Sequence, residues 1–141
     1  MIQAILDTNV VVQGLISTRK AASVETLQAL GENRFRLVAS ADTLLELGEV
    51  LELPILRARH HLAESEIWEL VSILEFYAAP LVEPRSVRSE VRDLSDRKFT
   101  DLIHAAEPDY LVTNDRRHLL SLKRIGRTRI VTPAAFLRHL K

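Results

Sequence analysis

The stretch that decides the fold is MIQAILDTN at residues 1–9, where a short apolar run stops at an acidic residue. Residues 2–6 are mostly apolar, which is typical of a strand in a sheet that is buried on both faces. Asp7 ends this strand, and α/β sheets bind their ligands at such carboxyl ends. The apolar residues that follow predict a helix, so Asp7, Thr8 and Asn9 place three oxygen-bearing side chains at one strand-to-helix turn. These residues alone leave two interpretations open, a ligand site and a plain helix cap.

The composition is that of an ordinary globular chain. Its 141 residues are 47% hydrophobic and 27% charged, which predicts one domain over residues 1–141 with a substantial core. There is no cysteine, which excludes disulfides and thiolate metal sites. No apolar run reaches transmembrane length, and the N-terminal residues lack the basic and hydrophobic regions of a secretion signal. We therefore expect a cytoplasmic protein.

The acidic and basic residues are distributed unevenly, although the formal net charge is zero. All 19 Asp and Glu residues precede Arg116, whereas eight of the 19 Lys and Arg residues lie within residues 116–141. Two interpretations remain open. The two parts of the chain neutralise each other in the fold, or the second part forms a basic surface for a polyanion beside an acidic pocket.

Short apolar runs alternate with helical patterns along the whole chain, which favours a parallel sheet with helices on both faces. Right-handed crossovers would bring the carboxyl ends of such strands to one edge of the sheet. The predicted fold class is α/β, a three-layer α/β/α arrangement around a mainly parallel sheet of about five short strands. We expect these strands near residues 2–6, 36–39, 80–82, 109–112 and 129–132.

A predicted helix that starts after Ser40 carries several acids. Ser40 is a suitable N-cap, and apolar residues at positions i, i+3, i+4 and i+7 form the stripe that faces the core. The acids that lie off this stripe are Asp42, Glu46, Glu49 and Glu52. Periodicity does not choose among them, because most acids on such a helix simply form a solvated face.

The helical pattern at residues 91–106 also begins with acids. Asp93 and Asp96 lie at its N-terminal end, where the helix dipole favours negative charge. Asp96 begins the helix that leads into the strand near residue 110. We expect this to be the wrong end of the helix for meeting the strand ends, unless a loop carries Asp96 up to them.

A later strand ends in the same way as the first. The apolar residues from 110 to 112 are followed by Thr113, Asn114 and Asp115, again three oxygen-bearing side chains. A short helix over residues 116–122 is expected next. Acids at two strand ends would thus meet at one edge of a parallel sheet.

Taken together, these segments resemble the PIN domain family, in the branch of toxin components related to VapC-like ribonucleases. The residues that carry the resemblance are LDTN at 6–9, TLLEL at 43–47, Asp96 followed by Lys98 and Phe99, and DYLVTND at 109–115. Each segment is short, but their order and spacing are fairly specific. The resemblance covers essentially the whole chain.

The resemblance implies a doubly wound sheet and four acids gathered around one or two divalent cations. Carried over to this chain, these acids are Asp7, Glu46, Asp96 and Asp115. It also implies supporting roles for Asn9 and Thr113. One position departs from the family, because relatives often have two adjacent acids, or an Asp-Asn pair, before the Lys-Phe pair, and here Ser95 precedes Asp96. Asp101, where relatives often carry an acid, and Asp93 are therefore further candidate supporting ligands.

The chemistry of this residue set agrees with the resemblance. Several carboxylates cluster only when cations neutralise them, and hard oxygen ligands without cysteine select Mg²⁺ or Mn²⁺. Such ions activate water and stabilise in-line displacement at a phosphodiester. We therefore expect a Mg²⁺- or Mn²⁺-dependent ribonuclease that is the toxin of a toxin–antitoxin pair. The basic residues expected to bind RNA phosphates are Arg116, Arg117, Lys123 and Arg124.

The resemblance further implies a homodimer and a cognate antitoxin protein as a partner. Three alternatives to the ribonuclease stay open. A structure-specific DNA nuclease would share the same metal site. A phosphatase with a nucleophilic aspartate would need a second Asp two residues after Asp7, where Asn9 stands. A non-enzymatic RNA-binding module remains if the change at Ser95 has inactivated the site.

Overall fold

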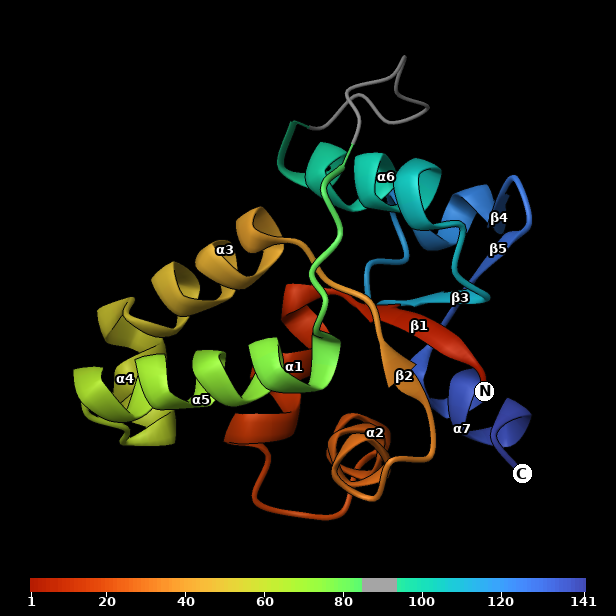
Figure 1. Cartoon of the computed structure of the whole chain (residues 1–141). Helices are drawn as coiled ribbons and strands as arrows, with labels where there is room; N and C mark the ends of the chain where they lie inside the picture. The colour runs from red at the N-terminus through yellow and green to blue at the C-terminus, as the bar shows by residue number, and fades with distance from the viewer. Residues whose placement is uncertain (85–93) are drawn as a thin grey trace.

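The computed structural model describes residues 1–84 and 94–141, and the side chains of residues 94–96 are outside this description. Strands and helices alternate along the chain (Figure 1). The strands are β1 (Gln3–Leu6), β2 (Arg36–Leu37), β3 (Tyr110–Val112), β4 (Arg124–Ile125) and β5 (Thr128–Val131). The α-helices are α1 (Thr8–Ile16), α2 (Ala22–Gly31), α3 (Ala41–Leu51), α4 (Pro54–His60), α5 (Glu64–Ala78), α6 (Leu94–Ala106) and α7 (Pro133–His139), and a 3₁₀ turn, η1, spans Leu120–Leu122.

The five strands form one sheet in the order β2-β1-β3-β5-β4. β1 pairs in parallel with β2 and β3, and β3 pairs in parallel with β5. The edge strand β4 runs antiparallel to β5, to which it is joined by a tight turn at Gly126, whose φ of +57° suits glycine. The predicted α/β class with a mainly parallel sheet is therefore confirmed.

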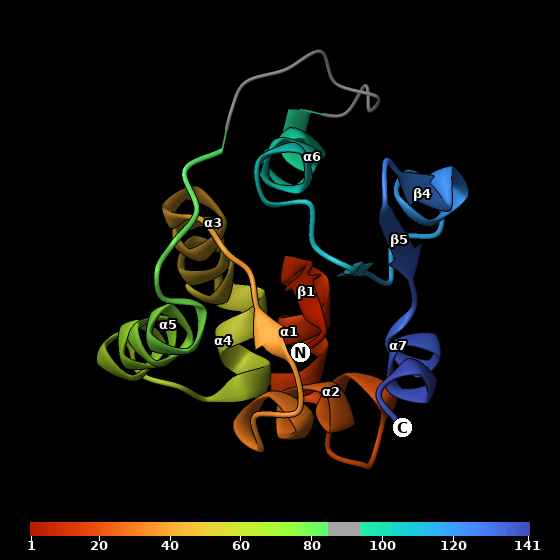
Figure 2. The ribbon, with the colours of Figure 1, turned by 45° about the vertical axis from the view of Figure 1, so that its right-hand side comes forward.

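Helices cover both faces of this sheet, and the two faces hold separate parts of the core (Figure 2). Ile5 and Leu111 point to one face, where they pack with the apolar side of α6. Ala4, Leu6 and Val112 point to the other face and pack with α1, α2, α3, α5 and α7. Because every residue from Ala4 to Leu6 is buried, β1 has the double-sided burial that its apolar sequence predicts.

The layer arrangement brings several chain segments to one edge of the sheet. β1 and β3 are parallel neighbours in register, so both end at this edge, and α1 begins there directly after β1. In Figure 1 this edge lies to the left of the sheet, between α3 and α6. No helix in the described residues is long and apolar enough to cross a membrane.

The strand expected at residues 80–82 does not form. This segment passes β2 with a backbone hydrogen bond from the Val82 N–H to the Ala39 carbonyl oxygen, at 3.0 Å. Pro80 and Pro84 have no N–H to donate, so they interrupt any regular ladder on this segment. The fifth strand of the sheet is instead β4, which the sequence pattern missed because it is only two residues long.

The short helix expected at residues 116–122 is also wrong for most of its length. A turn follows β3, and its last residues form the 3₁₀ turn η1. The Oδ1 atom of Asp115 accepts the N–H groups of Arg117 and His118, at 3.1 and 3.0 Å, as the N-cap residue of a helix does. The segment then departs from the α-helical pattern, because the Leu120 N–H bonds to the Asp115 carbonyl oxygen, five residues back, at 2.8 Å.

Candidate active site

Asp7 is buried at the end of β1, with 6% of its surface exposed. It stands in the N-cap position of α1, but its side chain makes no capping hydrogen bond. Its Oδ2 instead accepts a hydrogen bond of 2.6 Å from the Thr113 hydroxyl. The plain helix cap is therefore not the role of this carboxylate, and burying an acid without such a role favours a functional explanation.

Thr113 connects the two strand-end turns. Its side chain is fully buried, and its Oγ1 donates to Asp7 while accepting the backbone N–H of Asp115, at 2.9 Å. A second bond runs in parallel, from the Asn114 N–H to the side-chain oxygen of Asn9, at 3.2 Å. The turn after β1 and the turn after β3 are thus held together by side chains from both.

Glu46 reaches the same region from α3. Its Oε2 accepts a hydrogen bond of 2.8 Å from the Thr8 hydroxyl, and its Oε1 lies 3.1 Å from Nζ of Lys98 on α6. Ser40 caps α3 and forms a capping box with Thr43, which fixes where the helix begins. Asp42 and Glu49 of the same helix are exposed, so the structure distinguishes acids that periodicity could not.

The three acids Asp7, Glu46 and Asp115 line one pocket of about 490 Å³. Thr8 and Asn9 add oxygen-bearing side chains to its wall, and the remaining lining residues are Val12, Val50 and Phe99. We refer to this space as the acid pocket. It is open to solvent next to the edge of the sheet, as a site for a large substrate must be.

The other predicted acids are placed differently. Asp96 lies in the first turn of α6, but its side chain is outside the described residues, as is the whole of Asp93. Asp101 is half-buried further along α6 and does not line the acid pocket.

The sequence suggested that the start of α6 would lie away from the strand ends, and this expectation was wrong. In the second turn of α6, Lys98 contacts Glu46 and Phe99 lines the acid pocket. A helix that leads into a parallel strand runs antiparallel to that strand. The first turns of α6 therefore lie at the edge where β3 ends.

Two residues in contact with the acids were not among the predicted site residues. Thr8 binds Glu46 directly, and Lys98 forms an ion pair with it. The available signals were the hydroxyl beside Asp7 and the basic residue just before Phe99. Neither signal says which acid its side chain would meet, because Glu46 is far from both in sequence.

The predicted phosphate-binding residues also separate in space. Arg116 lines a second pocket, whereas its neighbour Asp115 lines the acid pocket. Arg117, Lys123 and Arg124 are exposed and line neither pocket. Their role in binding RNA stays a prediction.

The donor atoms around the acid pocket suit a hard divalent cation, because they are carboxylate, hydroxyl and amide oxygens. Within residues 1–84 and 97–141, however, no three His, Cys, Asp or Glu side chains lie close enough together to hold a metal ion. The ammonium group of Lys98 neutralises Glu46 instead. The described residues that line the acid pocket therefore fit a divalent cation by type.

Comparison with known proteins gives one finding on the family. A family model described as a PIN domain matches residues 3–117, which is well over half of the chain and includes all four predicted acids. Searches of the curated proteins and of the solved structures found no match.

Proposed function

The chain belongs to the PIN domain family, a family of nucleases, and from this premise we propose that it is a divalent-metal-dependent endoribonuclease that hydrolyses RNA phosphodiester bonds. We further propose that it is the toxin of a toxin–antitoxin pair.

The observation that carries the proposal is the arrangement around Thr113. Its hydroxyl joins a buried carboxylate at one strand end to the backbone of a second acid at the next strand end. Glu46 enters the same pocket from a third element. A fold that only needed stability would gain little from bringing three acids to one open pocket, because their mutual repulsion is unfavourable.

We propose that Asp7, Glu46, Asp96 and Asp115 hold Mg²⁺ or Mn²⁺. When bound, such an ion polarises the phosphate and lowers the pKa of water, which makes water the nucleophile. The side chains of this protein then have positioning roles. Thr113 fixes the orientation of the Asp7 carboxylate, and Thr8 does the same for Glu46.

The substrate class can be tested with matched oligonucleotides. The purified chain is incubated with labelled single-stranded RNA and with DNA of the same sequence, each with Mg²⁺, with Mn²⁺ or with EDTA. We expect cleavage of RNA that requires the metal. Cleavage of DNA alone would support a DNA nuclease, and binding of RNA without cleavage in either metal would support a binding module.

The identity of the acid on α6 gives a further prediction. Asp96→Asn should abolish metal-dependent cleavage, because one of four proposed ligands loses its charge, whereas Asp101→Asn should leave most activity, since Asp101 does not line the acid pocket. Initial cleavage rates and melting temperatures of both variants provide the measurement. Loss of activity in Asp101→Asn but not in Asp96→Asn would assign the role to Asp101.

The toxin role predicts a specific interaction with a cognate antitoxin. The acid pocket is a natural target for an antitoxin arginine, whose guanidinium forms paired hydrogen bonds with carboxylates. Co-expression with the product of a neighbouring small gene should therefore give a stable complex in which RNA cleavage is suppressed. Normal growth on induction of the chain alone, with active protein confirmed in the lysate, would contradict the toxin role but not the nuclease.

A protein partner also needs apolar surface, and the described residues offer some. Ile55 of α4 and Phe76 of α5 are 74% and 79% exposed. Exposed large side chains of this kind support an interaction surface for the antitoxin or for the second copy in the proposed homodimer. The molecular mass in solution, measured by light scattering at several concentrations, tests the homodimer.

A further inference from the structure

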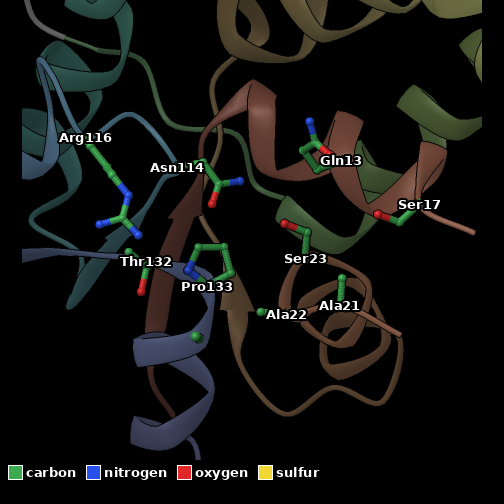
Figure 3. A pocket seen from close by; sticks show the side chains of 10 residues that line it. Gln13, Ser17, Ala21, Ala22, Ser23, Asn114, Arg116, Thr132 and Pro133 are labelled. Atoms are coloured by element: carbon green, nitrogen blue, oxygen red, sulfur yellow. The ribbon is translucent and has the colours of Figure 1, made fainter. Parts of the chain in front are cut away.

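A second pocket, of about 400 Å³, is lined by residues of α1, of the start of α2 and of the turn after β3 (Figure 3). We call it the arginine pocket, because Arg116 is the one charged residue among those that line it, all of which are described. Asn114 lines the arginine pocket, whereas its neighbour Asp115 lines the acid pocket. The bond from Asn114 N–H to Asn9 links the walls of both pockets.

The lining of the arginine pocket favours an anion. Its polar members are Gln13, Ser17, Ser23, Asn114, Arg116 and Thr132, with no carboxylate among the lining residues. Within the described part of the chain, the Arg116 guanidinium takes part in no hydrogen bond or ion pair. A cationic group held at the wall of a carboxylate-free pocket is available to a ligand.

The first turn of α2 forms part of the wall of this pocket. Ala21, Ala22 and Ser23 all line it, and the N-cap residue is Ala21, which has no side-chain acceptor. The first N–H groups of a helix have no partner within the helix, and they attract anions together with the helix dipole. Glu25 of the same turn does not line the pocket, and it pairs with Lys20 at 3.3 Å.

Ser23 provides an independent indication of a ligand. Only 6% of its surface is exposed, and among the described residues its hydroxyl has no hydrogen-bond partner. Figure 3 shows this hydroxyl directed into the pocket, toward the side formed by Asn114 and Pro133. Buried polar groups in proteins nearly always have a partner, so an unpartnered hydroxyl at a pocket wall calls for one from outside the chain.

Gly14 explains how Ser23 comes to lie there. A Cβ atom at Gly14 would stand 3.0 Å from the Ser23 carbonyl oxygen, so the absence of a side chain lets the start of α2 approach α1 closely. The Ser23 hydroxyl and the N-terminus of α2 thus line the same pocket as the Arg116 guanidinium of the turn after β3.

We propose that the arginine pocket binds a phosphodiester group of the RNA strand, next along the backbone from the bond held at the acid pocket. This inference rests on the proposed nuclease function. Ser23 and the first N–H groups of α2 donate to the phosphate oxygens, and Arg116 neutralises the charge. The strand therefore crosses the turn after β3, with one phosphate on each side of Asn114.

The test compares two variants with matched controls. Arg116→Ala and Ser23→Ala remove the cation and the unpartnered hydroxyl, whereas Arg138→Ala and Ser72→Ala remove the same groups from exposed positions outside both pockets. Affinity for a fluorescent single-stranded RNA is measured by anisotropy in EDTA, which prevents cleavage, over a range of salt concentrations. Arg116→Ala should weaken binding about tenfold, the size of one charge-assisted hydrogen bond.

The salt dependence of RNA binding provides a second comparison of Arg116→Ala with Arg138→Ala. Loss of one phosphate contact should reduce the slope of log K against log salt by about 0.7 in Arg116→Ala. Arg138→Ala should keep the slope of the parent chain. Equal affinity and equal slope in Arg116→Ala and Arg138→Ala would overturn the proposal.

A set of RNAs that each carry one neutral methylphosphonate linkage locates the contact. In the parent chain one linkage should weaken binding when it is neutralised, and in Arg116→Ala and Ser23→Ala that linkage should lose its effect. A flat profile would overturn the proposal. A second contradicting result would be that inorganic phosphate competes with RNA in the parent chain but not in Arg116→Ala, while no single linkage affects binding. That result would identify a site for a free anion.

Failure of this inference can be told apart from failure of the nuclease. If the parent chain cleaves RNA with metal but no single linkage affects binding, the proposed phosphate site in the arginine pocket is rejected and the proposed nuclease function is retained. A sensitive linkage that depends on Arg116, without cleavage in Mg²⁺ or Mn²⁺, would support the pocket on a chain that binds RNA without hydrolysing it.

Discussion

Replacing Asp7 with asparagine should abolish metal-dependent RNA cleavage while leaving the fold intact. We expect the rate to fall about a hundredfold or more, because a metal ion supplies several kcal/mol of transition-state stabilisation and Asp7 is its proposed central ligand. The amide oxygen can still accept the hydrogen bond of the Thr113 hydroxyl. Without metal, the change also replaces one of the carboxyl groups that line the acid pocket by a neutral amide, so the melting temperature in EDTA should hold or rise.

Asp42→Asn is the matched control for Asp7→Asn, because it makes the same charge change at an exposed position on α3. Its cleavage rate should equal that of the parent chain. Full activity in Asp7→Asn would reject the proposed mechanism, whatever the result for the control. A fall in melting temperature of Asp7→Asn would instead show that the carboxylate has a structural role.

Thr113→Val should affect both stability and activity. Valine has nearly the shape of threonine but leaves the Asp7 carboxylate without its hydroxyl donor and the Asp115 N–H without its acceptor. The loss of these two hydrogen bonds should lower the free energy of unfolding by about 2–4 kcal/mol. The acids also lose the contact that orients them, which should reduce cleavage about tenfold to a hundredfold.

Thr113→Ser separates these effects from simple loss of volume, because serine keeps the hydroxyl and removes one methyl group. It should retain most of the activity, with a loss of stability of about 1 kcal/mol from the small cavity. Urea unfolding and initial cleavage rates measure both variants. Parental activity in Thr113→Val would mean that the hydroxyl does not position the acids.

Much of the fold could be predicted from local patterns. The apolar run that ends at Asp7 predicted a strand buried on both faces, and the alternation of strands and helices predicted the parallel sheet and its helical layers. The prediction of a strand at residues 80–82 was wrong, because a short apolar segment between prolines has the same local pattern whether or not a neighbouring strand pairs with it. The two-residue strand β4 was missed because it is too short to show alternation.

The candidate site was less accessible to sequence reasoning. Periodicity left Glu46 equivalent to the other acids of α3, and it was selected by resemblance to the family alone. Its contacts with Thr8 and Lys98 come from packing between elements, which no local pattern encodes. The arginine pocket is a stronger example, because Ser23 looks like an ordinary residue in the first turn of a helix until its burial is known.

The bond between Thr113 and Asp7 spans 106 residues, and this separation governs when the site can exist during synthesis. A ribosome-bound chain that has emerged only as far as α5 contains Asp7 and Glu46 but lacks β3 and the turn that follows it. Contacts so distant in sequence form late, since most of the chain must be ordered before they close. The proposed site therefore cannot form on the ribosome until β3 and the turn that follows it have emerged and paired with β1.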